Sequence, residues 1–358
     1  MRLLSYLVLP LAALAAYLLF WPVPIAPQAW QPPPLPTERY APNRVLQAIE
    51  RIGEGIGVGP EGLAIDAQGR LHTGYVDGRV MRMNADGSAP KLLAETGGRP
   101  LGLALAPDGG VLVADAMRGL LHIGTDGSVD VLADAADGLP FRLTDDVDRP
   151  AASRKAYFSD ASSKFALPEL MAEVFEHRPH GRLLEYDFDS GQVRTLLSGL
   201  YFANGVAVGP DEAYVLVTET TRYRVTRYWL KGERAGTSEV FIDNLPGFPD
   251  NISFNGSDRF WLALYAPRTA ALDALLPQPY LRRVIFRLPH WFHPEPKLHA
   301  WVLGLDLDGR IVADLQYAGE DTFGPVTSVK QAGDALYLGS LGDTAIGRLP
   351  LSAIPTAP

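Results

Sequence analysis

From about Pro42 onward, apolar residues occur in short runs of four to six, separated by polar turns rich in glycine and aspartate. Alternation over so few residues is typical of β-strands, and DG, NG and SG pairs supply the positive φ angles that tight hairpin turns need. Apolar spacing typical of helices is scarce in this part of the chain. The pattern therefore predicts an all-β body built from many short strands.

One phrase recurs six times along this body, each time as a small apolar strand that ends in a polar turn. Its copies are PEGLAID at Pro60, RPLGLALAPDG at Arg99, TDDVDRP at Thr144, ANGVAVGPD at Ala203, PDNISFNGSD at Pro249 and PVTSVKQAGD at Pro325. Where nothing is inserted, the interval is about 40 to 45 residues, the period of a four-stranded propeller blade. We therefore predict a six-bladed β-propeller over residues 42–358. A β-sandwich is the alternative, but it gives no reason for one turn phrase to recur.

Two intervals are too long for a bare blade. The first contains Ser162 to His177, where Leu167, Leu170, Met171, Val174 and Phe175 recur at helical spacing, and the second runs from Pro267 to His299. Insertions between strands emerge at one end of a propeller, so we expect two helical insertions there. They either act as lids or pack an apolar stripe on the blades.

The N-terminus carries a different signal. Residues Leu3 to Trp21 are almost uninterruptedly apolar, Arg2 precedes them and a proline-rich tract follows. This length suits a transmembrane signal anchor (residues 1–21), followed by a Pro-rich linker (22–41) acting as a semi-rigid spacer. The positive-inside rule then places the propeller on the non-cytoplasmic side, whether periplasmic, lumenal or extracellular, on a single-pass membrane protein. A cleaved signal peptide and a buried core helix are the alternatives.

Charge and cysteine content exclude several classes of function. The formal net charge is −9 and no run of five Lys or Arg residues occurs, so we expect no nucleic-acid partner. The chain has no cysteine, which excludes disulfides, thiolate zinc sites and a cysteine nucleophile. The fold must hold without covalent cross-links.

Superimposing the six phrases places one residue of each just ahead of the innermost strand. These residues are Glu61, Leu101, Asp145, Asn204, Asp250 and, in the last blade, Val326 or Thr327. Equivalent positions of a propeller converge at one mouth of its central channel, and Asp146 and Asn251 follow directly. Such an oxygen-rich set suits Ca²⁺ better than Zn²⁺, while Mg²⁺ and Mn²⁺ accept the same donors. The alternative is that these residues only cap turns.

Several segments of the chain resemble those of a known protein family. The segments GPEGLAID, YFSDASSK, GRLLEYD, LSGLYFANGVAV, TRYWLKGERAGTSEVFIDNLPGFPDNI and LYLGS resemble the strictosidine-synthase-like family, which belongs with the paraoxonases and SMP-30/gluconolactonases. The N-terminal anchor and the LPQPYLRRVIFRLP insertion are similar to the membrane-anchored members of the adipocyte plasma membrane-associated protein type. The resemblance covers almost the whole chain after the anchor.

The resemblance implies a six-bladed propeller with Ca²⁺ near its axis, held by Glu61, Asn204, Asp250 and Asn251. The remaining ligand of the family is usually the Asn of an Asn-Asp pair, where this chain has Asp145 followed by Asp146. The catalytic glutamate of strictosidine synthases is matched by Thr327, and the catalytic histidine of paraoxonases by Leu101. Alkaloid condensation is therefore disfavoured.

Hydrolysis of a lactone or an (aryl) ester is the function that this site predicts. Ca²⁺ polarises the carbonyl in this hypothesis, and Asp250 or Asp146 activates water as the catalytic base. His177 and His180 are additional proton carriers or ordinary surface histidines. If the RRVIFRLPHWFHP stretch lies on a membrane, the substrates are hydrophobic. A non-catalytic membrane-anchored receptor or scaffold with structural calcium is the alternative.

Overall fold

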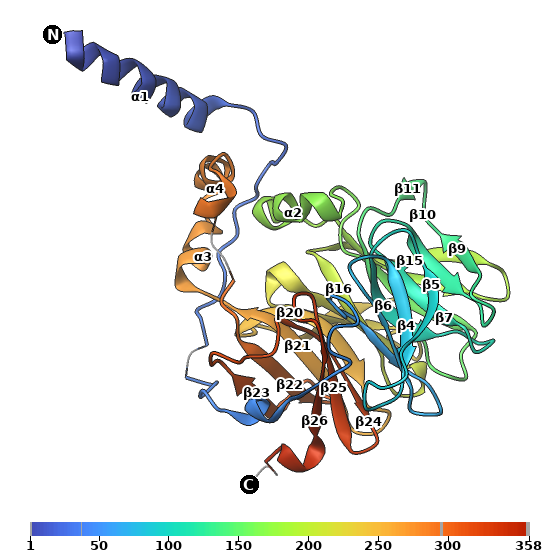
Figure 1. Cartoon of the computed structure of the whole chain (residues 1–358). Helices are drawn as coiled ribbons and strands as arrows, with labels where there is room; N and C mark the ends of the chain where they lie inside the picture. The colour runs from blue at the N-terminus through green and yellow to red at the C-terminus, as the bar shows by residue number, and fades with distance from the viewer. Residues whose placement is uncertain (1, 37, 294–295, 356–358) are drawn as a thin grey trace.

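The computed structural model describes residues 2–36, 38–293 and 296–355. These residues form six four-stranded antiparallel sheets arranged as the blades of a disc (Figure 1). The innermost strands β2, β6, β12, β16, β20 and β24 each contact the innermost strands of both neighbouring blades, so the ring is closed. The predicted six-bladed, all-β propeller is confirmed.

Each blade runs outward from the axis in chain order. Blade 1 holds β2 (Leu63–Ile65), β3 (Leu71–Gly74), β4 (Arg79–Met83) and β5 (Lys91–Glu95). Blade 2 holds β6 (Pro100–Leu105), β7 (Val111–Asp115), β8 (Gly119–Ile123) and β9 (Val129–Ala133). Blade 3 holds β12 (Thr144–Asp148), β13 (Lys155–Asp160), β14 (Gly181–Asp187) and β15 (Gln192–Leu200). A small hairpin of β10 (Ala135–Ala136) and β11 (Leu139–Pro140) precedes blade 3.

Blades 4 and 5 follow the same plan. Blade 4 holds β16 (Ala203–Val208), β17 (Tyr214–Glu219), β18 (Arg224–Trp229) and β19 (Ser238–Ile242). Blade 5 holds β20 (Gly247–Phe254), β21 (Arg259–Pro267), β22 (Ala300–Asp306) and β23 (Ile311–Tyr317). The 3₁₀ turns η3 (Pro210–Glu212) and η4 (Thr220–Arg222) flank β17.

Blade 6 joins the two ends of the propeller. Its three inner strands are β24 (Val326–Ala332), β25 (Ala335–Ser340) and β26 (Ile346–Pro350), and its outer strand is β1 (Glu50–Ile52) from the start of the body. Strand β1 pairs antiparallel with β26, Glu50 opposite Arg348. This pairing ties the beginning of the body to its end, and the 3₁₀ turns η1 (Val45–Ala48) and η6 (Leu351–Ala353) flank it.

Blades pack face to face through buried aliphatic and aromatic side chains, and near the axis the backbones themselves meet. A Cβ on Gly205 would lie 2.5 Å from Asn251 Cα and 2.6 Å from Asp250 O. Gly102 likewise faces the backbone of Asp146. Glycine at these positions lets the first strands of neighbouring blades approach closely enough to bring their side chains to one channel mouth.

Both predicted insertions are helical and lie on the same side of the disc (Figure 1). The first contains η2 (Leu167–Glu169) and α2 (Leu170–Glu176), and the second contains α3 (Ala270–Leu275), α4 (Pro279–Phe286) and η5 (His290–Phe292). Four of the five residues predicted as the apolar stripe of the first insertion join apolar clusters. Met171 does not, and is 37% exposed.

The N-terminal helix α1 (Arg2–Phe20) projects away from the disc (Figure 1). Over the residues that the structure describes, no helix meets the length and apolarity expected of a membrane span. The anchor over residues 1–21 therefore stays a prediction.

Residues 22–36 follow α1 and are called the strap below. Residues 22–41 were predicted to be a semi-rigid spacer, but in the structure the strap packs between α2 and α4, with Ile25 only 4% exposed. Arg268 Nη2 donates to Pro33 O at 2.8 Å, and Asn244 Nδ2 donates to Pro34 O at 3.0 Å. Because prolines keep this tract out of regular helices and sheets, its carbonyl oxygens are free to accept hydrogen bonds from side chains of the propeller. The tract is thus part of the folded unit.

Candidate functional site

The predicted site residues lie at one repeated irregularity of the innermost strands. Pairing of the first two strands shifts register between Pro100 and Leu103 in blade 2, and equivalent shifts occur in blades 3 to 6. The residues within the shifts include Leu101, Asp145, Asn204, Asp250 and Thr327. A bulge re-aims side chains at a strand end. The shifts support the predicted common phase and identify Thr327, rather than Val326, as the blade 6 residue.

The proposed metal ligands Glu61, Asp145, Asn204, Asp250 and Asn251 are called the ring below. Acidic residues at the ends of the second strands of blades 2, 3 and 4 fix the loops that lead to this end of the channel. Asp115 Oδ1 accepts hydrogen bonds from the backbone N–H of Arg99 at 3.1 Å. Asp160 Oδ1 accepts from Leu143 N at 3.2 Å, and Glu219 Oε2 accepts from Tyr201 N at 3.1 Å. Each acid thereby holds the backbone just before the site residue of its own blade.

Glu61 is tied to blades 5 and 6. Asn251 Nδ2 donates to Glu61 Oε1 at 2.8 Å, and Thr327 Oγ1 donates to Glu61 O at 3.2 Å. Ser328 Oγ donates to the same carbonyl. These bonds bring residues between 190 and 267 positions away from Glu61 in sequence into one cluster.

Asp146, the alternative base, points to a neighbouring blade. Its Oδ1 accepts from Val147 N and its Oδ2 from Val206 N of β16, both at 2.8 Å. Asp148 repeats the second contact by accepting from Val208 N at 2.8 Å. Both oxygens of Asp146 therefore serve the joint between blades 3 and 4.

The ring is buried and strongly acidic. Glu61, Asp145, Asn204, Asp250 and Asn251 are each between 2% and 6% exposed. Burial, followed by the charge of Asp146, raises the pKa of Glu61 to about 8. Burial and the charge of Glu61 raise the pKa of Asp145 and of Asp250 well above the ordinary range. Like charges in a buried cluster repel one another, and a bound cation would relieve this repulsion.

Unpaired oxygens in the ring provide a test of whether the residues fit Ca²⁺. Glu61 Oε2, Asn204 Oδ1 and Asn251 Oδ1 are buried and have no hydrogen-bond partner among the described residues. Buried acceptors without partners are rare in folded proteins, and hard oxygen donors are the ligands of Ca²⁺. The donor set therefore fits calcium.

The carboxylates alone do not make a metal centre. Across the described part of the chain, no three Asp, Glu, His or Cys side chains are grouped closely enough to hold a metal ion. The predicted set also depends on the carboxamides of Asn204 and Asn251. The metal assignment of Glu61, Asp145 and Asp250 therefore stays a prediction.

Two residues beside the ring were missed by sequence analysis. Arg99 is 5% exposed, donates from Nη2 to Gly59 O at 3.0 Å, and is close enough to Glu61 to lower its pKa. Tyr265, at the mouth end of β21, has a phenol whose pKa is raised by burial and then by the charge of Asp250. Arg99 stands in the repeated phrase itself, whereas an isolated tyrosine in a strand gives no signal.

The mouth beside the ring is apolar on several blades. Leu101, Ala116, Leu143, Ala161 and Phe202 form one buried cluster, and Leu167, Leu170, Val174 and Leu341 pack against it. Of these packed residues, Leu167 belongs to η2, and Leu170 and Val174 belong to α2. The first insertion therefore packs its apolar stripe beside the site residue Leu101, which confirms the packed helix, whereas its role as a lid stays a prediction.

The two histidines of this region differ in environment. His180 Nε2 lies 2.9 Å from Glu176 Oε1, in an ion-pair network. His177 is 1% exposed, and burial lowers its pKa to about 3. Among the described residues, no hydrogen bond or ion pair joins either histidine to the ring, so their role as proton carriers there stays a prediction.

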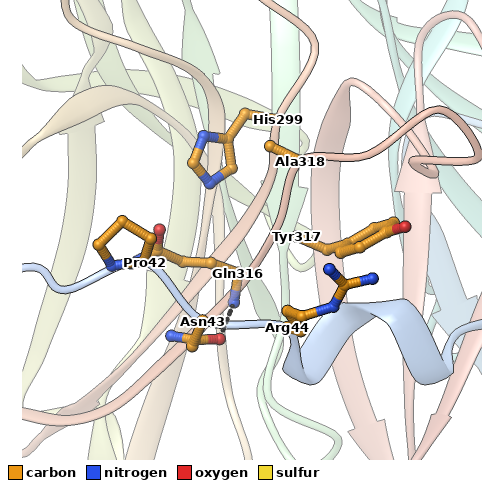
Figure 2. Close-up of a pocket in the computed structure, with 7 residues that line it drawn as sticks. All are labelled: Pro42, Asn43, Arg44, His299, Gln316, Tyr317 and Ala318. Carbon is orange, nitrogen blue, oxygen red and sulfur yellow. Dashed lines mark hydrogen bonds between the residues drawn. The ribbon is translucent and has the colours of Figure 1, made fainter.

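A separate surface pocket of about 220 Å³ lies at the rim of blade 5 (Figure 2). It is lined by Pro42, Asn43, Arg44, His299, Gln316, Tyr317 and Ala318. The bond from Gln316 N to Asn43 Oδ1, 2.9 Å long, closes one side of it. None of the predicted site residues lines this pocket, so it is a rim feature distinct from the axial ring.

Solved structures place this architecture in a known class. A gluconolactonase from Xanthomonas campestris superposes with a TM-score of 0.60 at 18% identity, covering 94% of this chain and 99% of that one. The calcium-binding protein regucalcin from Agrobacterium tumefaciens gives 0.59 at 17% identity over 84% and 92%. At such low identity the match concerns the fold, which is that of the gluconolactonase-like propellers.

Sequence comparison gives the family. Residues 145–233 match strictosidine synthase, and residues 38–83 match the N-terminal region of strictosidine synthase-like proteins. Protein strictosidine synthase-like 4 of Arabidopsis thaliana is 38% identical over 330 residues, 90% of this chain and 86% of the relative. Adipocyte plasma membrane-associated protein of Danio rerio is 32% identical over 382 residues, 99% and 90% of the two chains. The chain belongs to the strictosidine synthase-like family.

Proposed function

We propose that this protein is a Ca²⁺-dependent hydrolase of lactones or aryl esters. The observation that carries the proposal is the set of buried, unpaired oxygens of Glu61, Asn204 and Asn251 at one channel mouth. Asp145 and Asp250 complete the five proposed ligands. The gluconolactonase named among the solved structures supports a lactone as substrate, and the absence of a glutamate at Thr327 argues against condensation.

When bound, Ca²⁺ would polarise the substrate carbonyl and stabilise the oxyanion that develops on it. Asp250 is the proposed base and takes a proton from the attacking water. Asn204 is close enough to Asp250 to oppose the larger effect of burial, which raises the pKa of that carboxyl. Asp250 is a better candidate than Asp146, because both oxygens of Asp146 accept backbone N–H bonds. Burial and the charge of Asp250 raise the pKa of Tyr265, so its phenol stays protonated near that carboxylate.

The surroundings of the ring favour a substrate with a hydrocarbon part. Leu101, which replaces the paraoxonase-type histidine, belongs to a buried apolar cluster with Leu143 and Phe202. Leu170 and Val174 of the first insertion pack against this cluster. A substrate that carries an apolar chain or an aromatic ring would make favourable apolar contacts with these side chains. Hydrophobic esters and lactones are therefore the proposed substrates.

Chelation tests the proposal directly. We expect purified protein to bind Ca²⁺ after dialysis and to hydrolyse members of a panel of lactones and aryl esters. A chelator should abolish turnover, and added Ca²⁺ should restore it, with Mg²⁺ and Mn²⁺ tested in parallel. Bound Ca²⁺ without turnover on any substrate of the panel would instead support the non-catalytic receptor or scaffold, in which the metal only joins the blades.

We also propose that residues 1–21 anchor the protein in a membrane with the propeller on the non-cytoplasmic side. Arg287 Nη1 donates to Leu18 O at 2.8 Å, so α4 is bonded to the C-terminal end of α1. Phe20, Trp21, Trp291 and Phe292 are 61% to 78% exposed near this junction. Aromatic side chains favour the membrane interface. The relatives named as plasma membrane-associated agree with this assignment.

The anchor predicts behaviour in membrane extraction. The full chain should stay in the pellet when membranes are washed with alkaline carbonate, and external protease should reach the propeller from the non-cytoplasmic side. Introducing two charges by Leu11→Arg and Leu14→Arg should move the protein to the supernatant, because charged side chains at the centre of a bilayer are costly. Release of the unaltered chain by carbonate would exclude an integral anchor.

A further inference from the structure

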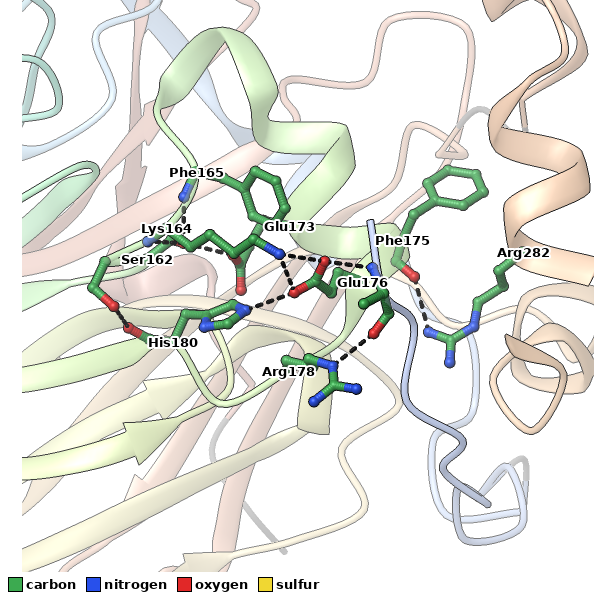
Figure 3. A network of polar contacts seen from close by, with 11 residues as sticks. Ser162, Lys164, Phe165, Glu173, Phe175, Glu176, Arg178, His180 and Arg282 are labelled. Atoms are coloured by element: carbon green, nitrogen blue, oxygen red, sulfur yellow. Dashed lines mark hydrogen bonds and ion pairs between the residues drawn. The ribbon is translucent and has the colours of Figure 1, made fainter. Parts of the chain in front are cut away.

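The strap binds the first insertion through regularly spaced backbone contacts. Ala26 N donates to Glu176 Oε2 at 2.7 Å, Gln28 N donates to Glu176 O at 3.1 Å, and Arg178 Nε donates to Ala26 O at 2.6 Å. Figure 3 shows Glu176 with its partner Lys164 and the neighbouring Arg178. The strap is therefore bonded along the C-terminal end of α2.

The second insertion holds the strap from the other side. Arg282 of α4 is 2% exposed and donates from Nη1 to Phe175 O at 3.0 Å. Figure 3 shows the bond from Arg282 to Phe175 O. Nη2 of the same side chain donates to Gln28 O, so one guanidinium bonds both the strap and α2. Trp30 N donates to Leu276 O at 3.2 Å, just after α3. The strap thus connects the two insertions.

At the centre of this joint lies His177, the C-cap of α2. Its ring stacks on Trp30 of the strap, with centroids 4.9 Å apart and planes 14° from parallel, and Tyr201 lies 5.2 Å away. Both ring nitrogens are buried and have no hydrogen-bond partner among the described residues. Arg222 lies over the rings of Trp30 and Tyr201, at 4.6 and 3.8 Å. A proton on His177 would have no acceptor here.

We propose that the strap is a latch that holds α2 over the channel mouth, and that acid releases it through protonation of His177. The device does not depend on the reaction catalysed at the ring. Release would free Glu176 and Phe175 from their strap and α4 contacts and expose the His177 ring to water. Helix α2 would then be held by its apolar stripe and by the bond from Ser162 Oγ to Glu173 Oε2.

The charged groups that face His177 agree in sign with this proposal. They are Arg222 of η4 and Arg282 of α4, and both lower the pKa of His177 after the larger effect of burial. Glu176 is ion-paired with Lys164 and has a lowered pKa, so it stays charged in mild acid. Burial raises the pKa of Glu173 to about 8, but Glu173 is bonded to Ser162 rather than to the strap.

The expected size of the effect follows from linkage. The latched state has a His177 pKa of about 3, below the ordinary value of 6.5, so it binds fewer protons than the released state between these values. Latching is fully present above pH 6.5 and weakens about tenfold for each pH unit below it. Between pH 7.5 and 5.0 the latching equilibrium should shift by about 30-fold.

Because the chain has no cysteine, spin labels can be attached at two introduced cysteines in the full-length protein. Ala29→Cys labels the strap and Ser190→Cys labels an exposed turn of blade 3. At pH 7.5 we expect one narrow distance distribution, and at pH 5.0 a second, broader population. Trp30→Ala should increase that population already at pH 7.5.

Replacing His177 with a residue that does not titrate tests whether protonation of this histidine causes the release. His177→Phe keeps a ring against Trp30 and should remove the pH response, and His177→Gln repeats the test without an aromatic ring. His180→Gln is the matched control and should retain the response. An unchanged distribution at pH 5.0 in the otherwise native chain, or a pH response that persists in both position-177 variants, would overturn the proposal.

Discussion

Replacing Asp250 with asparagine is expected to lower kcat by about 10³-fold on any ester or lactone that the protein hydrolyses, the range typical of a lost general base. The change removes the proton acceptor and one anionic metal ligand but preserves the shape of the side chain. Because Asp250 is 4% exposed and in the raised-pKa cluster, its neutral analogue should also relieve repulsion within the ring. The variant should therefore fold as well as the native chain while binding Ca²⁺ more weakly.

Three measurements separate these effects: circular dichroism for the fold, calcium affinity by titration calorimetry, and kcat at saturating Ca²⁺. The matched control is Asp258→Asn, an acid of the same blade whose side chain is 60% exposed and paired with Arg259. It should change kcat less than twofold. If Asp250→Asn retained native kcat with calcium bound, Asp250 would not be the base, although the calcium site itself could stand.

The blades were predictable because their signal is local and repeated. Each turn phrase requires Gly or Asp at fixed offsets from a short apolar strand, and six copies at one period leave few other architectures. The shared position of Glu61, Asp145, Asn204 and Asp250 was predictable for the same reason. Rotation about the propeller axis relates the blades, so residues at the same place in each repeat lie at the same end of the channel. The repeated register shift supplies the physical basis for that shared position.

Features that depend on contacts between blades were not predictable. Strand β1 is three residues long and partly exposed, so nothing in Glu50–Ile52 indicates that it closes blade 6. Asp145 and Asp146 are adjacent acids, yet only the structure shows that Asp146 bonds to β16. The sequence of the strap shows no strand or helix periodicity, and its prolines cannot donate the N–H bonds of a regular sheet. Its docking depends on Arg268 and Arg282, which are far away in sequence.

The largest expected effect on stability comes from Arg182, a buried residue of β14. Its Nη2 and Nε lie 2.6 and 3.1 Å from Asp160 Oδ2, and Nη1 donates to Ala136 O in the β10–β11 hairpin at 3.2 Å. Asp160 is fully buried and holds the backbone of Leu143, two residues before Asp145. Removing one partner of a buried pair leaves the other uncompensated, so Arg182→Ala should cost about 3–5 kcal/mol of folding free energy.

The pH dependence of this loss identifies its cause. Burial already raises the pKa of Asp160, and its bonds to Arg182 oppose that rise. Without Arg182 the folded-state pKa should increase further above the unfolded value, so the folded variant would bind more protons than the unfolded chain. The deficit should therefore be greatest near pH 8 and diminish as the pH falls toward 5.

Urea unfolding of the native chain and of Arg182→Ala at several pH values measures this loss of folding free energy. Arg194→Ala is the control, because its pair with Glu185 is formed by a side chain that is 64% exposed and should contribute at most about 1 kcal/mol. Adding Asp160→Asn to Arg182→Ala should recover part of the loss, since the amide oxygen still accepts from Leu143 N without a buried charge. A deficit independent of pH, with no recovery in the double variant, would mean that lost packing against Phe141 dominates.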